Sequence, residues 1–241
     1  MKIGLVTDTH DKYALIKEAV HILENEKCEY VLHGGDFSSN RSCQMFSHKS
    51  FNFKYVTDHK SHDKRLKERR DILKEKIGEC RFAMYHNTYH SSGNKKIGQV
   101  HDLATCGKYD FVIYGHLHYF NLKLPGPENE TVVINSGGFY YENLTTFCIL
   151  DLEAAKLTTF YLVGKKFFPI LRFSVFGQFE DIEILDRESA CLFADNLREM
   201  RWKFKDRWEF IFSQDSQQWF SKNYDIFFKK LKIKDNPDFF Y

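Results

Sequence analysis

The chain has 241 residues, 43% of them hydrophobic, which is enough for one large domain or for an ordinary domain with an appendage. Its formal net charge of +2 argues against nucleic-acid binding through bulk charge, and no run of about 18 apolar residues predicts a membrane span or a membrane partner. With no signal peptide at the N-terminus, and six cysteines without a CxxC pair, we expect a cytoplasmic protein with reduced thiols.

Hydrophobic patterning predicts alternating strands and helices over the first two-thirds of the chain. Strands are expected at 2–7, 30–33, 51–56, 81–85 and 110–114, and helices at 13–25, 63–77 and 97–106. Further strands are then expected in succession at 121–124, 131–135, 145–152 and 156–163. Alternating elements followed by a run of strands predict a layered α/β fold with helices outside the sheets.

After about residue 164 the sequence becomes rich in aromatic residues interleaved with Lys and Arg. One long helix is expected over 187–212, with these apolar side chains on one face: Leu192, Phe193, Leu197, Met200, Phe204 and Trp208. We therefore expect two parts, residues 1–164 and a mainly helical, aromatic-rich C-terminal extension, 165–241. The extension is expected to pack on the core or to form a homodimer, with a substrate lid that stacks bases as the alternative.

The expected strand ends carry Asp and His residues. In chain order these ends read Asp8-Thr9-His10, His33-Gly34-Gly35-Asp36, Thr57-Asp58-His59, His86-Asn87 and Gly115-His116-Leu117-His118. Each alone could be a helix cap or a packing residue, but ligands of open α/β sheets bind where strands end, so together they favour a shared ligand. Carboxylates and imidazoles without thiolate suit Mn, Fe, Zn, Ni or Co, and seven donors suit a pair of ions.

The order DTH, GGDF, a third strand-end element, an isolated His, GHLH and INSGG resembles the calcineurin-like metallophosphoesterase superfamily over residues 1–163, and most of all its small bacterial and archaeal phosphodiesterases. The resemblance implies a four-layer α-β-β-α sandwich and a dinuclear metal site with Mn as the first choice. It also implies ligand roles: Asp8, His10 and His118 on one ion, Asp36 bridging, and His86 and His116 on the other.

The third strand end departs from this family. Members have Gly-Asn, then His, Asn or Cys, then Asp, whereas this chain has YVTDHKSHD at 55–63. In the register that we favour, His59 replaces the ligand Asn. In a second register Asp58 is the ligand and His59 the neighbouring catalytic residue, and a third register uses Ser61-His62-Asp63. All three registers stay open.

Two further departures flank the expected site. Asn87 follows His86 where the family usually has Gly, and Asn tolerates the left-handed backbone. With Asn87, His90 is a candidate for substrate binding. Asn135-Ser136-Gly137-Gly138 stands where Asn-Pro-Gly-Ser is common and is expected to support the site from beneath. The other histidines are expected on the surface or in packing roles: His21, His33, His48, His62 and His101.

These observations predict a dinuclear, metal-dependent phosphodiesterase that acts on a nucleotide-like small molecule or a short nucleic acid. A hydroxide bridging the two ions would attack in line, and His59, Asp58 or His62 are the candidates to assist the leaving group. Two alternatives stay open. One is an inactive scaffold, as in the retromer subunit that shares this fold, and the other is a phosphomonoesterase or protein phosphatase.

Overall fold

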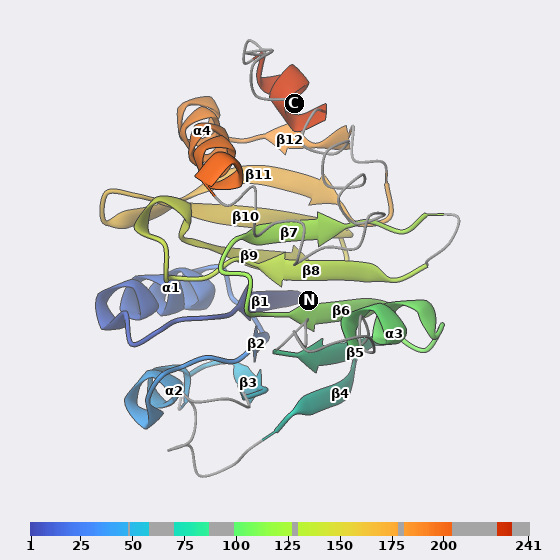
Figure 1. Ribbon diagram of the computed structural model, residues 1–241. Helices are drawn as coiled ribbons and strands as arrows, with labels where there is room; N and C mark the ends of the chain where they lie inside the picture. Colours follow the sequence, from blue (N-terminus) through green and yellow to red (C-terminus); the bar gives the residue numbers. More distant parts are fainter. Residues whose placement is uncertain are drawn as a thin grey trace.

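The computed structural model describes residues 1–47, 49–57, 70–86, 99–126, 130–177, 181–203 and 226–232. Two sheets lie face to face at its centre (Figure 1). The seven-stranded sheet has the order β12-β11-β10-β9-β1-β2-β3, and the five-stranded sheet has the order β4-β5-β6-β8-β7. The larger apolar cluster combines residues of both sheets, such as Ile3 and Leu5 of one sheet with Phe82 and Phe111 of the other.

The strands of the larger sheet are β1 (Lys2–Val6), β2 (Tyr30–His33), β3 (Asn52–Tyr55), β9 (Thr146–Asp151), β10 (Lys156–Val163), β11 (Lys166–Ser174) and β12 (Glu183–Ile184). Those of the smaller sheet are β4 (Ile72–Ile77), β5 (Cys80–Tyr85), β6 (Phe111–Tyr114), β7 (Phe120–Lys123) and β8 (Val132–Ser136). The labelled helices are α1 (Tyr13–Asn25), α2 (Asn40–Phe46), α3 (Gln99–Thr105) and α4 (Arg187–Lys203), with a 3-10 turn η2 (Glu142–Leu144). A further short helix lies at 226–231.

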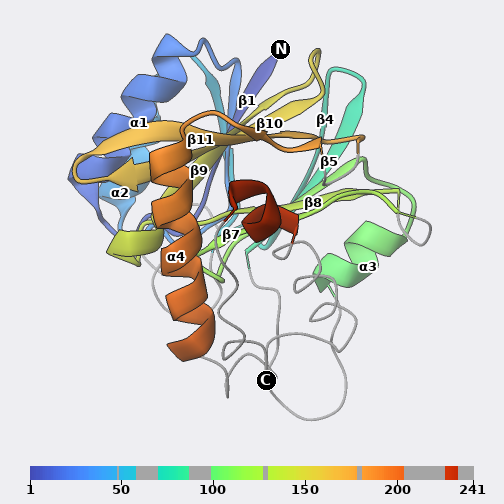
Figure 2. The same cartoon turned by 90° about the horizontal axis from the view of Figure 1, so that it is seen from above.

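The helices α1 and α3 lie on opposite outer faces of the paired sheets (Figure 2). Helix α1 buries Ile16, Ala19, Val20 and Leu23, which recur at helical spacing, in a second apolar cluster shared with α2. This is the four-layer α-β-β-α arrangement that the resemblance implied. In the part of the chain that the structure describes, no helix is long and apolar enough to cross a membrane.

Strand register brings the ends of strands from each sheet to one edge. Strands β1, β2 and β3 are parallel, and their pairing aligns Val6 with His33 and His33 with Tyr55. In the other sheet, parallel pairing aligns Tyr85 with Tyr114 and Tyr114 with Asn135. The residues that follow these strands therefore emerge together at the carboxyl edge, as expected for ligand sites in such sheets.

One expected helix is wrong. Residues 63–77 were expected to be helical, but Ile72–Ile77 form β4 and pair antiparallel with β5, while 63–69 lie outside the described residues. Leu73 and Ile77 are buried on a strand whose Lys and Glu side chains are more exposed, an alternation with a period of two. Gly78, with φ of +58°, makes the tight turn into β5.

The segment after residue 164 begins with a strand that the sequence reading did not include. Strand β11 pairs with β10 from Lys156–Ser174 to Val163–Lys166, and therefore continues the larger sheet. Helix α4 then packs on β10 and β11 through Ala190, Phe193, Ala194 and Leu197, which belong to the larger apolar cluster. In this way α4 covers the part of the larger sheet that extends beyond the smaller one (Figure 1).

The apolar face predicted for α4 is only partly the face that the structure buries. Phe193 and Leu197 are buried as expected, but Leu192 is 44% exposed and points away from the core. The chain returns to this helix at residues 226–232, where Phe227, Phe228 and Leu231 are buried in the same core. The Arg198 guanidinium lies 5.0 Å from the centre of the Phe228 ring. The outer part of the expected helix, with Phe204 and Trp208, lies outside the described residues.

Candidate metal centre

Four side chains meet where β1, β2 and β6 end. Ligand atoms of Asp8, His10, Asp36 and His118 all lie within 4.8 Å of one another. The His10 Nε2 is 3.0 Å from the Asp36 Oδ2 and 3.2 Å from the His118 Nε2. The His118 Nε2 is 3.2 Å from the Asp8 Oδ1. The structure thus brings together residues that are 108 positions apart in the chain, such as His10 and His118.

These spacings suit a shared metal ion. Ligand atoms bonded to one transition-metal ion at about 2.1 Å lie about 3 to 3.4 Å apart, depending on the coordination geometry. The three closest pairs in this cluster, at 3.0, 3.2 and 3.2 Å, fall in that range. A mixture of carboxylate and imidazole donors without thiolate is also the donor chemistry of Mn, Fe, Zn, Ni and Co sites. The residues present therefore fit a divalent transition metal.

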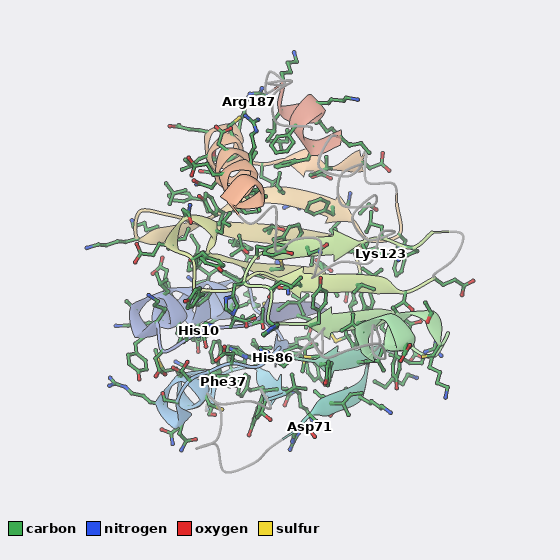
Figure 3. All side chains as sticks on the ribbon, viewed as in Figure 1. His10, Phe37, Asp71, His86, Lys123 and Arg187 are labelled. Carbon is green, nitrogen blue, oxygen red and sulfur yellow. The ribbon has the colours of Figure 1, made fainter. Side chains whose placement is uncertain are left out.

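His86 reaches the same region from the smaller sheet (Figure 3). Its Nδ1 lies 2.7 Å from the carbonyl oxygen of Gly34, and a carbonyl can only accept, so the proton is on Nδ1. The Nε2 is then an unprotonated acceptor. It is buried, it has no hydrogen-bond donor among the described residues, and it lies 3.9 Å from the Asp8 Oδ1. A buried lone pair facing a carboxylate is the state expected of a metal-ligating histidine.

His116 contributes in two ways. Its backbone N–H donates to both carboxylate oxygens of Asp8, at 3.1 and 2.9 Å, and so orients that carboxylate. Its imidazole is exposed and lies edge-on to the His86 ring, with the ring centroids 5.6 Å apart. His86 and His116 therefore lie beside the cluster of four rather than within it, as a second pair of imidazoles.

Asp8 is held as a carboxylate. The residue is fully buried, and burial alone would raise the pKa of its carboxyl. The neighbouring imidazoles of His86 and His118, together with the hydrogen bond from the Thr7 hydroxyl, outweigh burial, so the pKa lies below its usual value. Asp8 is therefore ionised near neutral pH, which is the form that binds a metal ion.

The backbone at the site is strained. Asp8, His10, Asp36, His116 and His118 all have positive φ, between 44° and 76°, a region that non-glycine residues rarely adopt. Each such residue costs on the order of 1 to 3 kcal/mol and persists only where the surrounding structure holds it. Five of them in one place are characteristic of a functional site.

Glycines leave room for the ligands to approach. A Cβ at Gly35 would lie 2.7 Å from the His86 Nδ1, and a Cβ at Gly138 would lie 2.8 Å from the Asp8 Cβ. A Cβ at Gly115 would also lie 2.7 Å from the His86 Nδ1. The Asn135 side chain supports this arrangement, because it donates to the Gly115 carbonyl and accepts from the Gly137 N–H.

His33 is buried but differs from the ligands. Its Nδ1 accepts the N–H of Gly35 at 3.1 Å, and its ring stacks on Phe37 with the centroids 3.7 Å apart. Burial lowers its pKa to about 3, so the imidazole is neutral. It takes the packing role expected for it, next to the chain segment that carries Asp36.

An aromatic rim at the site is absent from the sequence-based candidates. The Tyr140 ring centroid lies 5.0 Å from that of His10 and 4.8 Å from that of His118. Tyr141 packs edge-on against Tyr140, at 4.9 Å. The one signal in the sequence is that both tyrosines closely follow the glycine pair at 137–138. That motif was expected only to support the site.

Several predicted site residues lie outside the described part of the chain: Asp58, His59, His62, Asn87 and His90. Their roles at the third strand end and in substrate binding stay predictions. The structure does describe β3 up to Tyr55 and the following residues up to Thr57, at the same edge as Asp8 and Asp36.

A two-sheet sandwich with carboxylates and imidazoles gathered where its strands end defines the metallophosphoesterase class of protein. A sequence model of the calcineurin-like phosphoesterase superfamily domain matches residues 1–155, and the chain belongs to this superfamily. It is 31% identical over 167 residues to phosphodiesterase MJ0936 of Methanocaldococcus jannaschii, a match that spans 64% of this chain and 94% of that protein.

Two solved structures illustrate the similarity. An archaeal phosphodiesterase is 28% identical, with a TM-score of 0.53, over 67% of this chain and all of that one (100%). A single mutant of Vps29 from Entamoeba histolytica is 17% identical, with a TM-score of 0.56, over 72% of this chain and 98% of that one. The second likeness shows the fold alone.

Proposed function

We propose that this chain is a metal-dependent phosphodiesterase that hydrolyses a nucleotide-like phosphodiester. The observation that carries the proposal is the convergence of four carboxylate and imidazole ligand atoms within 4.8 Å, beside the buried Nε2 of His86. The 31% identity to a phosphodiesterase supports the same reaction. Residues 1–164 would form the catalytic part, with 165–241 completing its core or mediating a dimer.

The proposed ligand set serves two divalent ions. Asp8, His10 and His118 would hold one ion, and Asp36 would be shared by both. His86 and His116 would hold the other, which agrees with their position beside the compact cluster of four. Mn²⁺ is the first choice, with Fe, Zn, Ni and Co as alternatives of the same donor chemistry.

The metal ions, when bound, supply the Lewis-acid chemistry that activates water near neutral pH and neutralises charge on phosphate oxygens. The chain's own residues set the charge of the site. Two carboxylates and four neutral imidazoles balance only part of the charge of two divalent ions, so the site stays positive and attracts a phosphodiester anion. Gly34 fixes the tautomer of His86, and the His116 N–H fixes the orientation of Asp8.

The third strand end would complete the site. In the register that we favour, His59 is a ligand of the second ion, whereas Asp58 takes that role in the second register. His59 or His62 would then serve as the proton donor to the leaving oxygen. Metal content measured on Asp58→Ala, His59→Ala and His62→Ala distinguishes the registers, since the variant that loses one bound equivalent identifies the ligand. Asn87 and His90 are proposed to contact the substrate.

The deciding experiment is hydrolysis of bis(p-nitrophenyl) phosphate by purified protein, with added Mn²⁺ and after chelation. We expect activity that requires the metal and disappears in Asp36→Asn. Asp195→Asn is the matched control, because this exposed carboxylate on α4 lies far along the chain from the ligands and forms a long ion pair with Arg198, at 3.7 Å. Equal turnover in Asp36→Asn would contradict the proposal.

The same assay separates the other candidate functions. A phosphomonoesterase would hydrolyse p-nitrophenyl phosphate faster than the diester. A scaffold would hydrolyse neither compound with any divalent metal, and would act through protein partners instead. Sedimentation of the full chain tests whether it forms a homodimer.

A further inference from the structure

Tyr140 is an exposed aromatic residue at the rim of the metal centre. It is 51% exposed, although its ring contacts those of His10 and His118, with centroids 5.0 and 4.8 Å away. Both histidines belong to the group that could hold a metal ion. A large part of the tyrosine ring therefore faces solvent beside the place where a phosphate ester would be cleaved.

The segment that carries Tyr140 is held firmly. The N–H of Phe139 donates to the Asp8 carbonyl at 2.9 Å, and the Phe139 side chain is fully buried. On the other side, the Tyr141 carbonyl accepts from the Leu144 N–H and from the Thr145 hydroxyl. Buried and hydrogen-bonded neighbours on both sides of Tyr140 fix its backbone. The position of its ring at the rim of the metal centre is therefore fixed as well.

The rings around Tyr140 restrict it further. Tyr141 packs edge-on against it, with an interplanar angle of 84°, and the two histidines cover another part of its surface. An aromatic ring that is ordered in advance and still open on one side can stack a planar ligand at little cost in conformational entropy. Phe176 offers a contrast. It is 61% exposed, but its ring lies against that of Phe111, with the centroids 6.1 Å apart, and Phe111 begins β6 at the end opposite to the ligand cluster.

We propose that Tyr140 is a stacking platform for a planar aromatic ring of the substrate, so that the phosphodiester cleaved here carries a nucleobase or an aryl group on at least one ester arm. This inference rests on the proposed phosphodiesterase function and deepens it. Ring-on-ring stacking is tolerant of sequence and of the type of base, because every base has a π-face. Tyr140 would therefore select for an aromatic ring rather than for one particular base.

Binding by the Mn²⁺-loaded full chain tests the inference without reference to turnover. Calorimetry would compare AMP, which carries a base, phenyl phosphate, which carries a ring on the phosphate, and ribose 5-phosphate, which carries no aromatic ring. We expect AMP or phenyl phosphate to bind about 5- to 150-fold more tightly than ribose 5-phosphate. Whichever of the two shows the preference identifies the source of the ring.

Variants assign the preference to Tyr140. In Tyr140→Ala the affinity ratio should fall to about one, whereas Tyr140→Phe and Tyr140→Trp should retain it, because stacking needs the ring and not the hydroxyl. Phe176→Ala is the matched exposed-aromatic control and should keep the ratio. A ratio that persists in Tyr140→Ala, or equal binding of all three probes by the unmodified chain, would overturn the inference and leave the proposed function standing. Failure of every probe to bind would overturn both.

Discussion

The imidazole of His86 donates its Nδ1–H to the carbonyl oxygen of Gly34, 52 positions earlier in the chain, at 2.7 Å. This bond joins the two sheets at the edge where their strands end, since Gly34 follows β2 and His86 follows β5. It also decides the chemistry of His86, because it leaves the Nε2 lone pair directed toward Asp8. Residues that keep this bond in place should therefore control metal binding.

Gly115→Ala should weaken metal binding. The added Cβ would lie 2.7 Å from the His86 Nδ1 and 2.8 Å from the Gly34 carbonyl oxygen, so the imidazole must move. Loss of such a supporting contact typically lowers metal affinity about 10- to 100-fold. Competition with a chelating dye would measure it. Gly126→Ala is the control, because a Cβ there meets nothing within 4 Å among the residues that the structure describes. Equal affinities in the two variants would contradict the prediction.

Metal binding should raise the stability of the chain. An ion that binds only the folded state at 100 times its dissociation constant adds about 2.7 kcal/mol to the free energy of unfolding. Thermal unfolding with Mn²⁺ and with chelator would show an upward shift of Tm for the unaltered chain. Asp36→Asn should lose most of this shift, whereas His21→Gln, on the exposed face of α1, should keep it. A full shift in Asp36→Asn would be evidence against this site.

His33 should make the folded state less stable in acid. Its folded pKa of about 3 lies below the usual value of 6.5, so only the unfolded chain takes up the proton as the pH falls below about 6.5. The free energy of unfolding should then fall by about 1.4 kcal/mol per pH unit from this residue, or about 2 kcal/mol at pH 5.

Urea unfolding of the unaltered chain and of His33→Asn at pH 7 and pH 5 would measure this contribution. Asn keeps an acceptor for the Gly35 N–H but has no proton to take up. The variant is expected to be less stable at pH 7, since it leaves a cavity beside Phe37, yet to lose less stability on acidification. Identical pH dependence in the two proteins would show that His33 contributes nothing to it.

Helix α4 should be part of the cooperative core. Phe193 is 1% exposed and packs on Tyr161 of β10, with ring centroids 5.0 Å apart, so Phe193→Ala should cost about 3 to 5 kcal/mol. Leu192→Ala, at the exposed neighbouring position, should change stability by less than about 0.5 kcal/mol. Urea unfolding followed by two probes should show one coincident transition. Separate transitions would mean that α4 unfolds independently.

The sequence alone predicted the elements whose signals are local. Helix α1 was predicted with the bounds that the structure has, since its apolar residues repeat at helical spacing, and four of them, Ile16, Ala19, Val20 and Leu23, are buried on one side. Polar residues directly after apolar runs marked Asp8, Asp36, His86 and His118 as candidates for a shared ligand. That reading needed only the rule that strands end at a common edge. The fold implied by the family motifs is confirmed by the match of the family model over residues 1–155.

Local signals failed where long-range pairing decides the structure. The charged segment that includes β4 looked helical because Lys and Glu favour helices, but pairing with β5 and burial of Leu73 and Ile77 make it a strand. Leu192 has the composition of a core residue, yet its place on the α4 cylinder turns it away from β10 and β11. Strand β11 was missed because only its pairing with β10 shows that it continues the larger sheet.

The sequence by itself determined which side chains could bind a metal ion, because a ligand's chemistry belongs to the residue and its strand-end position can be read locally. Only the tertiary structure decided which of them meet, since the 3.2 Å approach of His10 and His118 depends on register in two separate sheets. The same holds for the tautomer of His86 and for Tyr140 at the rim. Both follow from contacts with distant residues, which no stretch of sequence contains.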